Sequence, residues 1–545
     1  MTFWLGCGLG SYAEGDTLSA YGADESATDG SHTSDTDATD TDPEGAGSVF
    51  PLARGGIEID RVQANQGVGV LIGADGSGVD PSERAAPLVK GRVTLIRAYW
   101  ALPDDWEPRE IEGRLTITQP DGSETIFSDT KNIEGEASEG DLSGSFFWGL
   151  TAEQIRPGSE FRVELFETSL EYDERSEPSP RVVLPAAGGN ALLGVRPEEL
   201  VMKVVLVPFE YDDGAGCVTA PDTSEDTMRR FQDAIYMQNP LERVDFEIHA
   251  PIRWDTPLTS FVPLNTFLAG LRFDEGAPPE AYYYGLIDVC ADGLGNAGGM
   301  AIGIPDDPLS ESAAALRVSS GLSIEPVWSA ETFVHEIGHS QGRHHVACNG
   351  DEGGPDEHYP HAGGDLGEWG FGVVDFGLRN PSSHKDYMTY CHPAWVGAWG
   401  WNEVYPIIEG LSAWGSTAER SGAEPGPDPH VESHVESHVD PYEGSMLLGT
   451  IEPDGREQWL TVPGSAPVAG ESSVLLEMHQ GDALVARVRA HTQPMQDGDG
   501  GRLVMAPLPS GWSSVTTITR VEGDTRNIVP RGSIAEHHRS RAIRR

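Results

Sequence analysis

The chain has no long apolar run and few positive charges. No stretch of 18 or more apolar residues occurs among its 545 residues, which excludes a membrane-spanning helix. Lys and Arg number 36 against 87 Asp and Glu, and the net charge is −51. Such a surface repels nucleic acids and anionic membranes, so we exclude both as direct partners. The many carboxylates offer ligands for Ca²⁺ but do not by themselves specify a function.

Cysteine is also scarce, with five residues in the whole chain. Four of them form an even set that fits two disulfide bonds in an exported protein. These four are Cys217, Cys290, Cys348 and Cys391. Four cysteines allow three pairings, of which we favour Cys217–Cys290 and Cys348–Cys391.

The fifth cysteine, Cys7, follows a short apolar segment in "FWLGCGLG". The segment resembles the end of a bacterial lipoprotein signal, in which the cysteine becomes lipid-modified. Six residues precede Cys7, fewer than a complete signal peptide has. The alternative is an N-terminus with an unimportant thiol. Residues 8–48 hold ten acidic residues and no Lys or Arg, so residues 1–49 are expected to end in a disordered tether.

Two patterns follow one another along the next part of the chain. Residues 50–199 repeat short apolar alternations such as "FRVELFE" between turn signals, which predicts a β-sandwich. Residues 200–413 mix strand and helix periods. "LVMKVVLVPFEY" is typical of a buried strand, and "SEDTMRRFQDAIYMQ" predicts a helix that buries Met228, Phe231 and Ile235. This middle part is therefore expected to be an α/β or α+β domain.

The rest of the chain is predicted to form a linker, a small β domain and a tail. Residues 414–442 form a linker whose "HVESHVESHVD" repeat includes His434 and His438, interpreted as solvated rather than metal-binding. Residues 443–530 again show strand alternation and predict a small β domain, and 531–545 form a basic tail. The fold class is thus a multidomain protein with a central α/β (α+β) domain flanked by N- and C-terminal β-sandwich-like domains.

Metal-binding residue types concentrate in "ETFVHEIGHSQGRHHVACNG", residues 331–350. Ser329 is expected to cap a helix that begins near Ala330. His335 and His339 are four apart on that helix, so they project from one face and can share a metal ion.

A third ligand is expected just after the helix. Gly342 tolerates positive φ and lets the chain turn, which returns His345 to the other two histidines. The neighbouring His344 is the competitor, but the spacing favours His345. Three neutral imidazoles on Zn²⁺ leave a fourth position for water. Glu336 is rotated about 100° from His335, so it is no ligand and is placed to take a proton from that water.

These residues satisfy H-E-x-x-H-x-x-G-x-x-H at each fixed position, and the chain thereby resembles the metzincin zinc endopeptidases. A random match to this longer pattern has a chance on the order of 10⁻⁴. The family also has a methionine in a tight turn beneath the zinc, and Met388 in "HKDYMTYCHPAW" fits that role. The resemblance implies that Tyr390, two residues later, helps to stabilise the oxyanion.

The segment between these motifs, "NGDEGGPDEHYPHAGGDLGEWGFG", resembles secreted or lipoprotein bacterial metalloproteases related to mucin-cleaving metzincins. The chain also resembles pappalysin-like metzincins, and the resemblance covers about residues 200–412. Arg343 stands where an apolar residue is more usual, which leaves the subfamily open. A Cys348–Cys391 bridge would clamp the loop of the third ligand to the methionine turn.

The resemblance implies a zinc-dependent endopeptidase with one catalytic Zn²⁺, outside the cell or on its surface, that cleaves protein or glycoprotein substrates. "GGMAIGI" is a candidate edge strand to which an extended peptide could pair. Trp395, Trp399 and Trp401 follow the methionine turn, and we expect two of them to lie in the core. The alternative is a surface adhesin with an idle metzincin domain, against which the intact Glu336 argues. A zinc hydrolase for non-peptide amides is a third hypothesis.

Overall fold

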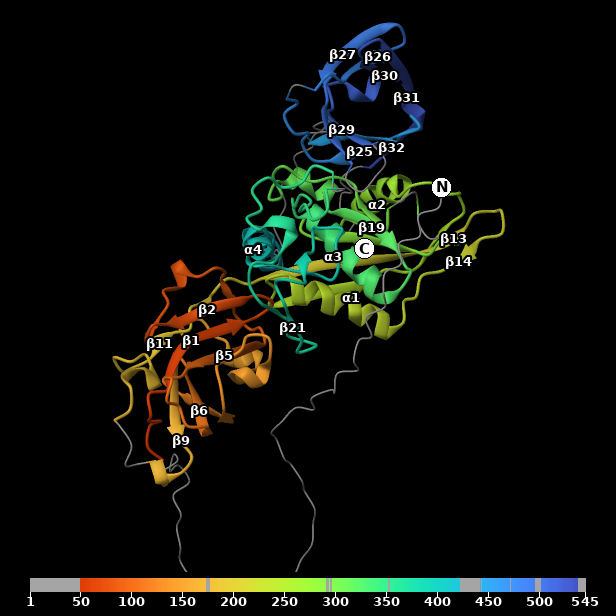
Figure 1. The fold of residues 1–545 in the computed structure, drawn as a ribbon. Coiled ribbons are helices and arrows are strands. Elements are labelled where there is room, and N and C mark those ends of the chain that lie inside the picture. The colour runs from red at the N-terminus through yellow and green to blue at the C-terminus, as the bar shows by residue number, and fades with distance from the viewer. Residues whose placement is uncertain are drawn as a thin grey trace, which may run out of the picture. The chain divides into compact units, whose positions relative to one another are not determined.

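A computed structural model describes residues 50–537, apart from 173–176, 291–293, 295–296, 351–352, 422–441, 443, 471 and 496–500. The predictions for Cys7, His434 and His438 lie outside the described residues. The described chain is rich in β-structure, with several separate sheets and few helices, as expected (Figure 1). None of its helices is long and apolar enough to span a membrane.

Two antiparallel sheets form the first third of the described chain. One has the strand order β3-β2-β1-β5-β8, and the other has β10-β9-β6-β7, with β11 also paired to β9. The side chains of β9 alternate between buried and half-buried, as "FRVELFE" predicts. The bounds of these strands are Glu58–Asn65 (β1), Gly69–Ala74 (β2), Ser77–Gly78 (β3), Thr94–Ala101 (β5), Arg109–Thr118 (β6), Glu124–Ile133 (β7), Phe146–Leu150 (β8), Glu160–Glu167 (β9), Val183–Leu184 (β10) and Ala191–Leu192 (β11). A short parallel pair, Leu88–Val89 (β4) and Val195–Arg196 (β12), lies beside them.

A seven-stranded sheet follows, with the path β14-β13-β17-β19-β18 and with β15 and β16 also paired to β13. Strands β13, β15, β16, β17 and β19 run parallel, whereas β18 ends the path and is antiparallel to β19. The strand predicted in "GGMAIGI" is therefore an edge strand. The bounds are Val201–Asp212 (β13), Val218–Thr219 (β14), Arg243–Ile248 (β15), Ile252–Trp254 (β16), Tyr282–Ile287 (β17), Gly299–Ala301 (β18) and Val318–Leu322 (β19).

Helices cover both faces of this sheet (Figure 1). Alternate residues of β17 enter two cores: Tyr284 packs with α1 (Glu225–Gln238) and α3 (Pro326–Ser340), and Tyr283 packs with α2 (Val262–Asp274). The prediction of α1 and of its buried side chains is confirmed, because Met228, Phe231 and Ile235 are all buried.

Two helices were not predicted from the sequence. α2 is buried around most of its circumference, so it lacks the amphipathic stripe that reveals a helix. The other, α4 (Ala398–Ser421), contains Pro406, which normally ends a helical pattern. Because α4 continues to Ser421, the predicted boundary at residue 413 falls inside a helix.

Small two-stranded sheets and two further sheets complete the described fold. The C-terminal sheets have the orders β28-β29-β24-β25-β32 and β27-β26-β30-β31. Met446 and Leu448 of β24 share a core with Leu264 and Leu268 of α2. The small pairs are Gly370–Phe371 (β20) with Leu378–Arg379 (β21) and Lys385–Asp386 (β22) with Ala394–Trp395 (β23). The C-terminal bounds are Ser445–Ile451 (β24), Glu457–Pro463 (β25), Leu475–Gln480 (β26), Ala483–Arg489 (β27), His491–Pro494 (β28), Arg502–Pro507 (β29), Thr517–Glu522 (β30), Thr525–Pro530 (β31) and Ile534–Glu536 (β32).

One buried arginine ties the first sheets to the last turn of α1 and the segment after it. Arg92 is fully buried and donates hydrogen bonds of 2.7–3.2 Å to the carbonyl oxygens of Gln66, Tyr236, Met237 and Leu241. Its guanidinium also lies over the Tyr236 ring, 4.2 Å from the centroid. Four carbonyl groups on two parts of the chain therefore depend on a single side chain.

Arg92→Met is expected to lower the free energy of unfolding by about 3 kcal/mol or more, because buried acceptors that lose their donor keep their desolvation cost. Urea denaturation followed by tryptophan fluorescence would measure the loss. The matched control is Arg229→Met, whose side chain is 60% exposed and pairs with Asp226. We expect this control to change stability by less than about 0.5 kcal/mol, and equal effects of the two variants would contradict the role of Arg92.

Candidate metal centre

The helix that carries the candidate ligands, α3, begins earlier than predicted. Its first residue is Pro326, and the side chain of Glu325 caps it by accepting hydrogen bonds from Val327 N and Trp328 N. Proline suits a first helical position because its missing N–H has no partner there in any helix. The predicted cap, Ser329, instead lies in the first turn, and its hydroxyl accepts a hydrogen bond from Ile324 N. The prediction of a helix start near residue 330 was therefore wrong.

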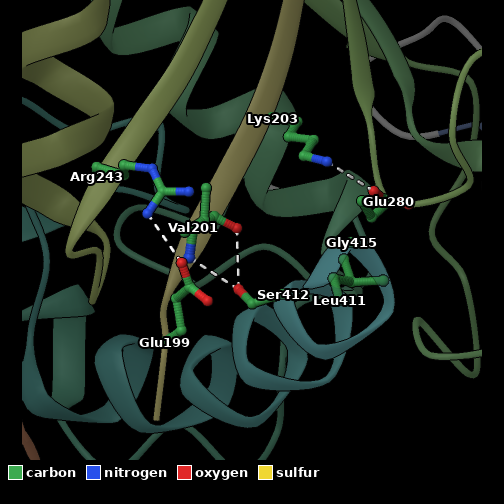
Figure 2. A pocket seen from close by; sticks show the side chains of 8 residues that line it. All are labelled: Glu199, Val201, Lys203, Arg243, Glu280, Leu411, Ser412 and Gly415. Atoms are coloured by element: carbon green, nitrogen blue, oxygen red, sulfur yellow. Dashed lines mark hydrogen bonds and ion pairs between the residues drawn. The ribbon is translucent and has the colours of Figure 1, made fainter. Parts of the chain in front are cut away.

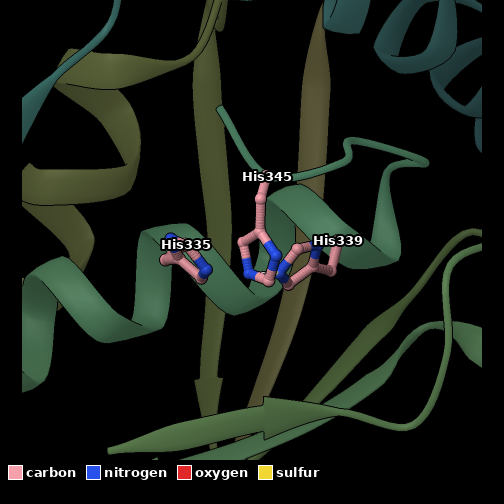
Figure 3. Close-up of side chains that lie close together, drawn as sticks. All are labelled: His335, His339 and His345. Carbon is pink, nitrogen blue, oxygen red and sulfur yellow. Dashed lines mark hydrogen bonds between the residues drawn. The ribbon is translucent and has the colours of Figure 1, made fainter. Parts of the chain in front are cut away.

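Three histidines meet at the end of α3. His335 and His339 lie on the helix and His345 on the loop after it, and their rings converge (Figure 3). One ligand nitrogen from each lies within 4.8 Å of the others, and the Nε2 atoms of His339 and His345 are 3.1 Å apart. All three side chains are at least 92% buried. Tetrahedral zinc with bonds near 2.0–2.1 Å separates its ligand nitrogens by about 3.3 Å, so the spacing of His339 and His345 fits such an ion.

The orientation of each ring is set by the backbone. The distances from Nδ1 to a carbonyl oxygen are 2.8 Å for His335 and Tyr387, 2.7 Å for His339 and Arg343, and 2.8 Å for His345 and Gly353. A carbonyl only accepts, so each Nδ1 must donate, and in a neutral imidazole the lone pair is then on Nε2. Histidines that bind metals are typically oriented in this way. The donor set therefore fits a divalent cation such as Zn²⁺.

Glycine at position 342 is required for two reasons. Its φ is +88°, and an added Cβ would lie 2.6 Å from the ring of Pro308. The turn that follows brings His345 to the other two histidines, whereas His344 is exposed and belongs to no such group. Among the described residues, the three histidines form the one group whose ligand atoms could hold a metal ion. A calcium site stays a prediction without a described set of ligands.

Met388 lies in a tight turn that packs against α3 at Gly338. Thr389 N donates to Asp386 O at 3.0 Å, which closes the turn, and Val346 N donates to Met388 O at 2.9 Å. Met388 is fully buried, and its Sδ lies 2.5 Å from where a Cβ of Gly338 would be. Gly338 stands between His335 and His339 on α3 and was not singled out from the sequence, because only the tertiary contact reveals the need for glycine there.

The side chain of Glu336 extends from α3 to the edge strand β18. Its side chain is 2% exposed, and Oε1 lies 2.8 Å from where a Cβ of Gly299 would be. Gly299 thus leaves room for the carboxylate beside the strand. Burial, and next to it the charge of Glu336, raises the pKa of Tyr284 well above its ordinary value. Tyr284 therefore stays protonated at neutral pH.

Tyr390 lies next to the histidines and is partly exposed. Its ring centroid is 4.8 Å from that of His345 and 6.0 Å from that of His335, and the residue is 41% exposed. The adjacent Cys391 is bonded to Cys348, which follows His345 by three residues. The second bridge joins Cys217 to Cys290. Both predicted pairings are therefore present, and the disulfides fit an extracellular or otherwise oxidising environment.

The three tryptophans after the turn divide as expected. Trp395 and Trp401 are buried, with 4% and 0% exposure, and Trp399 is half-buried with its Nε1 3.3 Å from Asp356 Oδ2. The sequence did not indicate a fourth aromatic residue, Trp328 at the start of α3. It is 57% exposed and stacks on His392 with ring centroids 5.0 Å apart.

A carboxyl group with a strongly shifted pKa, that of Glu368, contacts the N-terminus of α4. Burial raises the pKa of Glu368 to about 7 from near 4.5, and its carboxylate accepts a hydrogen bond from Ala398 N. Because the folded-state pKa is the higher one, stability is expected to fall as pH rises from about 4.5 to about 7.

Glu368→Gln keeps the acceptor and removes the charge. We expect the variant to be more stable than wild type by an amount on the order of 3 kcal/mol at pH 8, and equally stable at pH 4.5. Urea denaturation at both pH values measures this. A stability difference that does not change with pH would show that the charge of Glu368 is not its cause.

A small pocket lies beside β13 and α4 (Figure 2). Its charged side chains are already paired: Lys203 Nζ is 3.0 Å from Glu280 Oε1, and Arg243 Nη1 is 2.9 Å from Glu199 Oε1. The cavity of about 20 Å³ has room for roughly one water molecule. Size and charge both argue against an organic ligand there.

No protein-family model matches the chain, and no curated protein matches it.

Proposed function

We propose that the protein is a zinc-dependent endopeptidase of the metzincin type that cleaves protein or glycoprotein substrates outside the cell or at its surface. The observation that carries the proposal is the group of three buried histidines, each with Nδ1 on a backbone carbonyl, beside the carboxylate of Glu336. Three neutral imidazoles leave a tetrahedral ion one position for water, as catalytic zinc sites require.

When bound, Zn²⁺ supplies a Lewis acid that acidifies water and polarises a carbonyl group. Glu336 accepts the proton of the attacking water and delivers it to the leaving amine. Tyr390 lies against His345 and His335, where its hydroxyl can donate to the oxyanion as negative charge develops. This role of Tyr390 rests on the resemblance to metzincins as well as on the position of its ring.

The substrate is expected to bind as an added strand. β18 is the edge of the central sheet, and Glu336 packs directly against its first residue, Gly299. A peptide paired to this edge would bring a carbonyl group close to Glu336. The exposed aromatic surface near the N-terminus of α3 then offers a place for a substrate side chain, because Trp328 and His335 are seven residues apart on one helix face, about 10 Å.

Trp328→Ala is expected to raise KM by about tenfold with little change in kcat, because an exposed aromatic ring that contacts substrate contributes to uniform binding. Steady-state kinetics on an unfolded protein substrate measures this, and Trp328→Phe should retain most of the affinity. The control is Ile528→Ala, a 66% exposed apolar residue of the C-terminal sheets. An unchanged KM in the Trp328→Ala variant would remove this residue from the binding surface.

The function is tested by incubating the full chain with a panel of unfolded and mucin-type proteins, with and without a zinc chelator. Cleavage that the chelator abolishes and added zinc restores supports the proposal. Bound zinc without cleavage of any substrate favours the alternative of a surface adhesin. The absence of bound zinc would refute the metal centre. Anchoring through a lipid on Cys7 stays a prediction, which mass spectrometry of the exported protein can test.

A further inference from the structure

A buried ion pair joins two segments that contact the histidines. Arg343 Nη2 is 3.8 Å from Asp386 Oδ1, with the two side chains 4% and 0% exposed. The guanidinium lies over the ring of Tyr387, 5.6 Å from its centroid. Buried ion pairs contribute little to stability on average, because desolvation offsets their attraction. Their presence therefore calls for another reason.

The two partners of the pair belong to the segments that orient two ligands. The carbonyl oxygen of Arg343 accepts from His339 Nδ1, and that of Tyr387, next to Asp386, accepts from His335 Nδ1. Asp386 Oδ1 also accepts a hydrogen bond from Met388 N at 2.9 Å. One ion pair thus joins the loop after α3 to the methionine turn, at the positions where both segments hold a histidine ring.

The surrounding backbone is shaped to leave room for this pair. A Cβ at Gly400 of α4 would lie 2.7 Å from Arg343 Nη1 and 3.3 Å from Asp386 Oδ2. A Cβ at Gly338 of α3 would lie 2.9 Å from Tyr387 Cε2. α4 therefore has a glycine where a side chain would meet the ion pair, and α3 has one where a side chain would meet the ring of Tyr387.

We propose that Arg343 and Asp386 are positioning residues of the metal centre: their ion pair holds the carbonyl groups that fix the rings of His339 and His335. The inference rests on the metal-binding part of the proposed function. It also accounts for Arg343, which departs from the apolar residue usual in metzincins. Without the pair, the two carbonyls shift relative to each other, and the rings lose the common orientation that a tetrahedral ion requires.

The test compares zinc dissociation constants of the full chain and its variants by competition with a chelator. Arg343→Met and Asp386→Asn are each expected to weaken zinc binding by about 10–100-fold. Asparagine keeps an acceptor for Met388 N, so the loss would report the ion pair. The double variant should bind zinc about as weakly as either single variant, because the pair acts as a unit. Arg343→Lys keeps the charge and should recover part of the affinity. The visible absorption of the Co²⁺-substituted protein should change in the single variants.

A purely structural role is distinguished by Arg109→Met. Arg109 and Glu167 form a buried ion pair in the first sheets, with the closest atoms 3.0 Å apart and 3% and 0% exposure. This control should lower the thermal midpoint without changing zinc affinity. The inference is overturned if the Arg343 and Asp386 variants also lose only thermal stability, or if their effects on zinc affinity add. A wild-type chain that binds no zinc would overturn the metal centre and this role together, whereas zinc binding without peptidase activity would refute the endopeptidase alone.

Discussion

Replacing Glu336 with glutamine is expected to lower kcat/KM for protein cleavage by about 10²–10⁴-fold while zinc stays bound. Glutamine has nearly the same size and fits the space beside Gly299, but it cannot accept the proton of the attacking water. The carboxylate is 2% exposed, so bulk water cannot replace it as a base. Zinc content and cleavage rate are therefore measured on the same preparation.

The control for this variant is Glu357→Gln, which removes one negative charge from an exposed position in the loop after the third ligand. We expect it to retain cleavage within about threefold of wild type, since exposed charges act weakly through water. Activity of Glu336→Gln within tenfold of wild type would contradict a general-base role. Loss of zinc from that variant would instead mean that Glu336 supports the ligands.

The sequence predicts those parts of the candidate metal centre that depend on local geometry. His335 and His339 share a helix face by spacing alone, and Gly342 marks the turn that returns His345. The start of α3 was misplaced because the serine at 329 looked like a cap, whereas Pro326 and Glu325 perform the tasks of first residue and cap. The predicted start and the observed start of α3 both rest on local sequence signals, so the sequence alone could not decide between them.

The importance of residues that are required by tertiary contacts could not be predicted from the sequence. Gly338, Gly299 and Gly400 are ordinary glycines in the sequence, and only the approach of Met388, Glu336 and the Arg343 guanidinium shows why a side chain is excluded at each. Arg343 looked like a departure from a family pattern until its partner 43 residues later was placed beside it. Contacts of this kind connect segments that no period or spacing relates.

The adjacent histidines at 344 and 345 provide the sharpest test of the ligand set. His345→Gln is expected to weaken zinc binding by about 10²–10³-fold, since structural zinc sites with four protein ligands bind with about 10–16 kcal/mol, or about 3 kcal/mol for each ligand. His344→Gln changes the same residue type one position earlier, on an exposed side chain outside the group, and should leave zinc affinity within about twofold.

Both variants are measured by chelator competition at pH 7.5, where unbound imidazoles are largely neutral. Thermal denaturation of the metal-free proteins shows whether either substitution disturbs the fold itself. If the His344 variant loses zinc and the His345 variant keeps it, the third ligand is the other histidine, and the turn at Gly342 must close differently in the metal-bound protein. If neither loses zinc, neither histidine is a ligand, and a centre of three histidines, with the open position that the role of Glu336 requires, cannot stand.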